Sequence, residues 1–231
     1  MKVLVIIPCY NEEKNILNTV KKIKKTKYDY IVINDGSKDN SQKILENNKI
    51  KYINLPNNTG IGGAVQTGYK YAYNNDYDIA VQFDGDGQHN ENYIKNIIKP
   101  IEKKEANMVI GSRFIGTESE FKSTKIRRVG ITILSKILKL LTKKEINDMT
   151  SGFRAVDRNI IEIFQKNYPE EYPEPVTNLS ISKKGFEIKE VPVKMQERKF
   201  GKSSINSIKS AYYMFNVILL FFIISFSKGD D

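Results

Sequence analysis

Short apolar runs alternate with amphipathic segments through the first half of the chain. Short apolar runs predict strands at 2–8, 30–34, 50–55, 78–83 and 107–112, the first of them buried. Between them, apolar residues recur at helical spacing at 12–25, 41–48, 62–73 and 92–101. Strands and helices that alternate in this way predict an α/β fold, with a mainly parallel sheet covered by helices on both faces.

Polar side chains follow several of these strands at their carboxyl ends. They are Tyr10 and Glu12 after the first strand, Asp35 after the second, Asp84 and Asp86 after the fourth, and Arg113 after the fifth. Ligands of open parallel sheets bind beyond the carboxyl ends of the strands, so we expect these side chains to converge on one rim. Each also has a structural alternative, because Asp35 could shape a turn and Glu12 could be a first-turn acid favoured by the helix dipole.

Composition restricts the chemistry of that rim. The 231 residues, of which 40% are hydrophobic, suffice for one sizeable core. The chain has one cysteine, Cys9, and one histidine, which excludes an internal disulfide framework and a His-rich metal site. This indicates a reducing, cytoplasmic setting, and the apolar run before Pro8 is too short for a signal peptide.

The net charge of +10 indicates an anionic partner, which could be a nucleic acid, a membrane surface or a phosphorylated substrate. Basic residues gather at 122–144, without an acid between them, and again at 194–209. A nucleic-acid-binding protein is disfavoured, because the chain lacks an aromatic and basic recognition module and two closely spaced aspartates would stay unexplained.

The glycine-rich segment NTGIGGAV (58–65) does not match the common phosphate-binding motifs. It lacks the G-K-[ST] of a P-loop, and Val65 stands where a dinucleotide fingerprint needs Gly or Ala. Gly60 and Gly62 are therefore expected to serve a tight turn and close backbone packing. A bound diphosphate would need another counter-charge, and Asp84-Gly85-Asp86 offers oxygen ligands for Mg²⁺ or Mn²⁺, with Gly85 letting the backbone approach a ligand.

Six motifs stand in the order typical of one enzyme family. They are IPCYNEE (7–13), NDGSKDNS (34–41), DGDGQH (84–89), GSRF (111–114), DMTSGFRA (148–155) and ERKFGKSS (197–204). The set resembles family 2 glycosyltransferases of the GT-A fold and, more narrowly, the polyprenol-phosphate sugar synthases. The resemblance covers about residues 3–210, and it departs from the family pattern at Met149, where many relatives have proline.

The resemblance implies roles for individual residues. Pro8, Tyr10, Glu12 and Asp35 would hold the nucleoside, and Asp84 with Gly85 would lie near the ribose and diphosphate. Asp86 and Gln88 would ligate the metal, whereas His89 is expected to be structural or to support a ligand. Arg113 would bind phosphate, and Arg198 and Lys202 would lie on a loop that closes over the donor. Asp148 lies in a segment that could reach the site, and we expect it to be a catalytic residue.

Two apolar helices are predicted outside the sheet. Residues 122–144 combine a basic stripe with one broad apolar face, made by Ile126, Val129, Ile133, Ile137, Leu140 and Leu141. This pattern favours a helix at a membrane surface over a core helix with solvated lysines, and the resemblance places the acceptor phosphate at Arg128 and Thr132. Residues 211–226 are almost wholly apolar but short for a single span, so we expect shallow membrane insertion or packing on a partner, with a core helix as the alternative.

Together these patterns predict a membrane-associated enzyme with a GT-A domain at 1–210 and a membrane-associating segment at 211–231. It would move a hexose from a UDP- or GDP-linked sugar to a polyprenyl phosphate by a single inverting displacement, at the cytoplasmic face of the membrane, without a nucleic-acid partner. A small membrane protein or a second copy could be a further partner. The alternative is extension of a surface polysaccharide at a sugar hydroxyl, which would need a carboxylate base, Asp148 or Glu174. The motifs leave the sugar and the nucleotide open.

Overall fold

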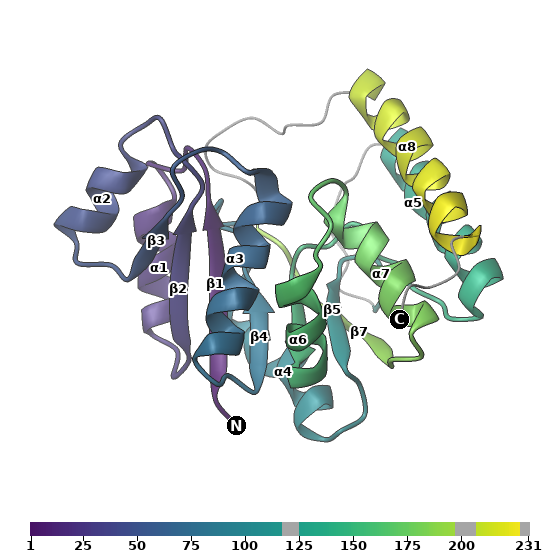
Figure 1. The fold of residues 1–231 in the computed structure, drawn as a ribbon, viewed down its shortest axis with the longest axis horizontal. Coiled ribbons are helices and arrows are strands. Elements are labelled where there is room, and N and C mark those ends of the chain that lie inside the picture. Colours follow the sequence, from purple (N-terminus) through teal and green to yellow (C-terminus); the bar gives the residue numbers. More distant parts are fainter. Residues whose placement is uncertain (117–124, 197–206, 227–231) are drawn as a thin grey trace.

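The structure, a computed structural model, describes residues 1–116, 125–196 and 207–226 (Figure 1). Its centre is a seven-stranded sheet in the order β3-β2-β1-β4-β6-β5-β7. The strands are β1 (Val3–Cys9), β2 (Asp29–Asn34), β3 (Tyr52–Asn54), β4 (Ile79–Gln82), β5 (Met108–Ser112), β6 (Arg154–Asp157) and β7 (Ile188–Pro192). All neighbouring strands are parallel except that β6 runs antiparallel to both β4 and β5. The predicted α/β fold with a mainly parallel sheet is confirmed.

Helices cover both faces of this sheet. They are α1 (Ile16–Lys24), α2 (Ser41–Asn47), α3 (Gly60–Asn74), the short 3₁₀ helix η1 (Glu91–Tyr93), α4 (Ile94–Glu102), α5 (Lys125–Thr142), α6 (Arg158–Lys166), α7 (Pro173–Lys183) and α8 (Ser207–Phe226). Apolar residues of α1, α2 and α4 join the apolar cluster on one face, and those of α3, α5, α6, α7 and α8 join the cluster on the other, where α8 contacts α5 and α7.

The central strand β1 shows why the chain forms two cores. Its side chains alternate between the faces: Leu4 and Ile6 belong to one apolar cluster, and Val5 and Ile7 belong to the other. All four are buried. A strand that is buried on both faces needs apolar residues at every position, which is why this run reads as continuously hydrophobic.

Helices α5 and α8 lie side by side at the end of the molecule opposite β3 (Figure 1). They approach closely at Gly130, where a Cβ atom would lie 2.8 Å from the Met214 side chain. Within α5 the body of the protein buries Ile131, Leu134 and Leu138. The predicted single broad apolar face is therefore wrong.

The apolar residues of α5 divide between two sides because the helix packs on the body and on α8 at once. Val129, Ile133 and Leu140 are exposed, whereas Ile137 and Leu141 pack against the core. The side chain of Ile126 lies outside the described residues. The outward side keeps a row of apolar residues next to the basic stripe.

Helix α8 also has two sides. Val217 and Phe221 are buried against the body, and the opposite side exposes Tyr212, Phe215, Leu219, Phe222 and Ile223. Of the helices in the described part of the chain, none has the length and apolar character needed to cross a membrane. The helix thus packs on the protein through one face only. The domain boundary expected at 210/211 stays a prediction.

Candidate active site

The first part of the rim lies where β1 and β2 end. The backbone N–H of Asp35 donates to the Cys9 carbonyl at 2.9 Å, which ties the two strand ends together. The Asp35 Oδ1 atom accepts from both the backbone N–H and the hydroxyl of Thr59, at 2.7 and 2.8 Å. Asp35 therefore braces the loop that leads into α3. Its predicted contact with a nucleobase stays a prediction.

The glycines of that loop behave as expected. Gly60 has a φ of +77°, a left-handed conformation that glycine adopts without steric cost. A Cβ atom on Gly62 would lie 2.3 Å from the Pro169 carbonyl, so α3 can approach the segment before α7 only through a glycine. These two positions serve turn geometry and close packing, as predicted.

The other residues assigned to the nucleoside lie at the end of β1. Pro8 is buried within the strand, and Tyr10 is 42% exposed just beyond it. The Glu12 carboxylate accepts from Asn15 Nδ2 at 2.7 Å, and the Glu12 backbone N–H donates to the Ser41 hydroxyl. The structure therefore places all three on the predicted rim.

Asp84 and Asp86 follow β4 on the same rim. A Cβ atom on Gly85 would lie 2.7 Å from the Pro8 carbonyl, so this glycine is needed where β4 passes the end of β1. Gly85 therefore has a packing role, and the expectation that it lets the backbone approach a ligand stays a prediction. Gly152 lies similarly close to Asp84, because a Cβ atom there would lie 3.0 Å from the Asp84 carboxylate.

His89 is buried and contacts both the backbone and the carboxylate of Asp84. Its Nδ1 atom accepts from the Asp84 backbone N–H at 3.1 Å, and its Nε2 atom lies 3.5 Å from the Asp84 carboxylate. The ring stacks on Phe153 with centroids 4.8 Å apart, and burial lowers the pKa of His89 to about 4. A neutral imidazole that accepts at Nδ1 carries its proton on Nε2, facing the carboxylate. This geometry agrees with the supporting role expected for His89.

The two aspartates form a small set of oxygen donors. Asp86 Oδ1 accepts from the Gln88 backbone N–H at 3.0 Å, and Gln88 Nε2 points to the Gln196 carbonyl at 3.5 Å. Among the described residues, no group of three or more His, Cys, Asp or Glu side chains is placed to hold a metal ion. Mg²⁺ and Mn²⁺ sites in nucleotide enzymes commonly use one or two carboxylates and take the remaining ligands from phosphate and water, and the aspartates fit that type of site.

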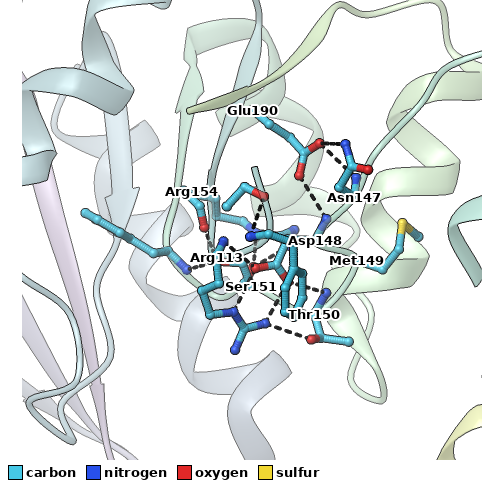
Figure 2. Close-up of polar contacts among 12 residues, drawn as sticks. Arg113, Asn147, Asp148, Met149, Thr150, Ser151, Arg154 and Glu190 are labelled. Carbon is cyan, nitrogen blue, oxygen red and sulfur yellow. Dashed lines mark hydrogen bonds and ion pairs between the residues drawn. The ribbon is translucent and has the colours of Figure 1, made fainter. Parts of the chain in front are cut away.

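Arg113 and Asp148 form a buried ion pair at the centre of a polar network (Figure 2). Arg113 Nε and Nη2 donate to the two Asp148 oxygens at 2.7 and 2.6 Å, and the Arg113 backbone N–H donates to Asp148 Oδ2 at 2.9 Å. Nη2 also donates to the Thr150 hydroxyl at 2.9 Å. The Glu190 carboxylate accepts from the backbone N–H groups of Asn147 and Asp148, both at 2.8 Å.

This network argues against Asp148 as a base. Asp148 is fully buried, and both of its oxygens accept hydrogen bonds from Arg113. Sequence reasoning could not pair these residues, since they are 35 positions apart and on different segments. Asp148 holds Arg113 in place.

A cavity of about 480 Å³ extends from Asp84 towards α8. Its lining includes Gly60, Ile61, Asp84, Thr150, Gly152, Glu170, Glu171, Tyr172, Pro173, Glu174, Tyr213 and Met214. Burial raises the pKa of Glu174, and the nearby Arg154 guanidinium acts in the opposite direction. Glu174 is therefore the carboxyl group to which a base role could still apply.

Arg154 is a residue that sequence reasoning missed. Its guanidinium is completely buried and donates to the Ser151 carbonyl at 2.8 Å and to the Thr177 hydroxyl at 2.7 Å. The available signal was its place at the end of the motif DMTSGFRA, inside what proves to be strand β6. It supplies a fixed positive charge behind the cavity wall.

Arg128 and Thr132 lie in a second hollow, of about 440 Å³, together with Lys136 and Lys139. Among the residues that the structure describes, none lines both hollows, so Arg128 and Thr132 are not brought to Asp84 there. The segment around the Arg113–Asp148 pair separates the hollows: Thr150 lines the first, and Phe114 and Asn147 line the second. The Thr132 hydroxyl donates to the Arg128 carbonyl at 3.0 Å. Arg198 and Lys202 lie outside the described residues.

Comparison with known proteins gives consistent results. Residues 4–164 match the family described as Glycosyl transferase family 2. The UDP-N-acetylglucosamine–dolichyl-phosphate N-acetylglucosaminyltransferase of Methanococcus voltae is 35% identical, covering 94% of this chain and 95% of that protein. Polyprenol monophosphomannose synthase of Mycolicibacterium smegmatis is 25% identical, covering 94% and 85%.

A solved structure matches the fold over the whole chain. Glucosyl-3-phosphoglycerate synthase from Mycobacterium tuberculosis, in complex with Mn²⁺, uridine diphosphate and phosphoglyceric acid, superposes with a TM-score of 0.73 at 13% identity. The match covers 100% of this chain and 80% of the other. At this identity the likeness concerns the fold alone.

Proposed function

The chain belongs to glycosyltransferase family 2, and we propose that it transfers a hexose from a nucleoside-diphosphate sugar to polyprenyl phosphate. The observation that carries the proposal is the position of Asp84, which stands on the rim with Asp86 and also lines the cavity that reaches α8. The names of the two relatives and the motif order support the lipid acceptor. The named substrate of the Methanococcus relative and the uridine diphosphate in the solved complex favour a UDP-linked donor.

The oxygen donors at the rim fit a divalent cation, Mg²⁺ or Mn²⁺. Asp86 would hold it, together with Gln88 and with Asp84 beside the diphosphate. When bound, the ion would offset the negative charge that builds up on the leaving diphosphate. The Mn²⁺ in the solved complex agrees with this assignment.

The acceptor explains why the site can work without a dedicated base. A polyprenyl phosphate is already anionic at neutral pH, so its oxygen can attack the anomeric carbon without losing a proton to the protein. The remaining requirement is to bring two anionic groups together and align them, which calls for fixed positive charge and positioning. Two buried guanidiniums lie behind the cavity lining: Arg113, which is paired with Asp148, donates to Thr150 of the lining, and Arg154 donates to Thr177 of α7.

The surface beside the cavity suits a membrane. The outer sides of α5 and α8 expose large apolar residues, and the basic stripe of α5 lies at their edge. Apolar side chains bordered by Lys and Arg are typical of helices that lie on an anionic leaflet. We place the enzyme at the cytoplasmic face of the membrane, where Arg128 and Thr132 would meet the acceptor headgroup before it enters the site. A small membrane protein or a second copy is the alternative occupant of this surface.

The direct test is a panel of UDP- and GDP-sugars, incubated with the enzyme, polyprenyl phosphate in anionic vesicles, and Mg²⁺ or Mn²⁺. We expect a sugar-labelled product that extracts into organic solvent and releases free sugar in mild acid, as a sugar–phosphate bond should. EDTA should abolish its formation. Absence of a lipid product with every donor, despite metal-dependent nucleotide binding, would contradict the proposed acceptor.

A sugar-hydroxyl acceptor is a second candidate, because Glu174 lines the same cavity as Asp84. A hydroxyl must lose a proton near the transition state, and a base in this position would be Glu174. Glu174→Gln separates the two functions: the variant should keep most of its transfer to polyprenyl phosphate, whereas transfer to a hydroxyl would fall by about two to four orders of magnitude.

A further inference from the structure

Asn216 is a polar residue within the apolar helix α8, and its side chain points to α7. Asn216 Nδ2 donates to the Tyr172 hydroxyl at 3.0 Å. The Tyr172 ring also meets the Tyr213 ring edge to face, with centroids 4.7 Å apart and planes at 81°. Two contacts from α8 therefore hold one side chain at the start of α7.

Tyr172 has an unusual backbone conformation. It is the residue before α7, with φ 51° and ψ 46°, in the left-handed region that non-glycine residues rarely adopt. Pro173 follows it and fixes the first turn of the helix. Conformations of this kind persist when the surrounding structure holds them, and here α8 provides the contacts to the side chain.

The same residues enclose the cavity that starts at Asp84. Tyr172 and Pro173 line it from the beginning of α7, and Tyr213 and Met214 line it from α8. Tyr172, Pro173, Tyr213 and Met214 form the apolar and aromatic part of this lining, and the carboxylate residues Glu170, Glu171 and Glu174 flank Tyr172 and Pro173 in the chain and line the same cavity. Removing α8 from its position would open one wall of the cavity.

A second attachment joins the C-terminal ends of the same two helices. Lys183, at the end of α7, donates through Nζ to the carbonyl oxygens of Ile224 and Ser225, at 2.6 and 3.4 Å. This contact lies about a helix length away from Tyr172, since α7 runs from Pro173 to Lys183. It therefore offers a control that loosens α8 without touching the cavity.

We propose that Asn216 and Tyr172 are positioning residues for glycosyl transfer. Their hydrogen bond fixes α8 against the start of α7, so that Tyr213 and Met214 complete an apolar cavity wall. On the proposed function, this wall receives the isoprene unit next to the acceptor phosphate, because a branched hydrocarbon matches an apolar and aromatic surface. The C-terminal helix is then part of the catalytic site as well as a membrane contact.

The test compares Asn216→Leu, Tyr172→Phe and their double variant with the control Lys183→Met, all in the full-length enzyme. We expect each single variant to lower kcat/KM for a long-chain polyprenyl phosphate about tenfold, mainly through KM. The double variant should lose no more than either single change, because both remove the same contact. Lys183→Met should stay within about twofold of the wild type. Metal-dependent UDP binding, measured by calorimetry, should be the same in all four.

Each outcome decides a separate point. Wild-type kinetics in Asn216→Leu, or an equal loss in Lys183→Met, would overturn the positioning role. A raised KM for the donor in place of the acceptor would show that the wall contacts the sugar, which contradicts the isoprene assignment. If the wild-type enzyme makes no lipid product, the proposed function fails instead. Hydrogen exchange of residues 212–218 would then still show whether Asn216 fixes α8, since we expect faster exchange there in Asn216→Leu and not in Lys183→Met.

Discussion

Replacing Asp148 by Asn distinguishes a structural ion pair from a catalytic base. If Asp148 were a base, the variant would fold normally and lose rate. The structure instead predicts a loss of stability, because Asp148 Oδ2 accepts from the backbone N–H and the Nε–H of Arg113. The asparagine side chain has one oxygen and one NH₂ group. If the NH₂ group faces the two donors, both of those hydrogen bonds are lost; if the oxygen faces them, the bond from Arg113 Nη2 is lost.

The magnitude follows from burial. Asp148 is fully buried and Arg113 is 5% exposed, so the guanidinium left behind has little access to water. Removing one partner of a buried ion pair typically costs about 3–5 kcal/mol of unfolding free energy. Arg113→Met should cost a similar amount, since it leaves the carboxylate unpaired. The double variant Arg113→Met/Asp148→Asn should cost less than the sum of the two by roughly 3 kcal/mol, because no buried charge of the pair remains.

Urea unfolding of the four proteins, followed by circular dichroism, measures this coupling. Lys189→Met is a matched control, because it breaks an exposed ion pair with Glu105 and should change stability by less than about 1 kcal/mol. Additive losses in the double variant would refute the reasoning. So would an Asp148→Asn protein of wild-type stability with a rate reduced a thousandfold, which would restore Asp148 as a catalytic group.

Two substitutions and one labelling experiment test other parts of the structure. Asp86→Asn should abolish metal-dependent transfer while leaving the melting temperature within a few degrees, and a variant with wild-type metal dependence would contradict the ligand assignment. Gly85→Ala should destabilise the fold by about 1–3 kcal/mol, because its Cβ would overlap the Pro8 carbonyl; unchanged urea unfolding would count against that contact. Cys9 should react with a thiol reagent at pH 8 about a thousandfold more slowly than an unfolded thiol, since burial raises its pKa from 9.0 to about 12; equal labelling rates with and without urea would show that the thiol is accessible.

The sequence predicted the first five strands because each is a run of apolar residues between clear turn signals. It did not reveal β6, since Arg154 begins this four-residue strand and a charged residue rarely marks a buried one. Helix α7 was missed for a different reason. Most of its residues are buried around the whole helix, including Thr177, Asn178 and Ser182, so no amphipathic period was visible.

The site was predictable to the extent that it depends on topology. The rule for open parallel sheets placed Asp35 and Asp84 on one rim before any side-chain contact was known. Pairings across long stretches of chain could not be read in this way. Examples are the Asn216–Tyr172 hydrogen bond, between residues 44 positions apart, and the stacking of His89 on Phe153.

On the proposed function, the two sides of α8 would connect catalysis with the membrane. The described part of α8 is apolar on most of its surface, and its side with Val217 and Phe221 is buried against the protein whereas the opposite side is exposed. Each large apolar side chain that remains exposed would contribute about 1–2 kcal/mol on burial, so covering all five in lipid would contribute on the order of 5–10 kcal/mol before ordering costs. The same helix turns Tyr213 and Met214 into the cavity. A substrate with one apolar and one charged end could therefore keep its hydrocarbon in the bilayer while its phosphate reaches Asp84, which is the arrangement that transfer to a membrane-bound acceptor requires.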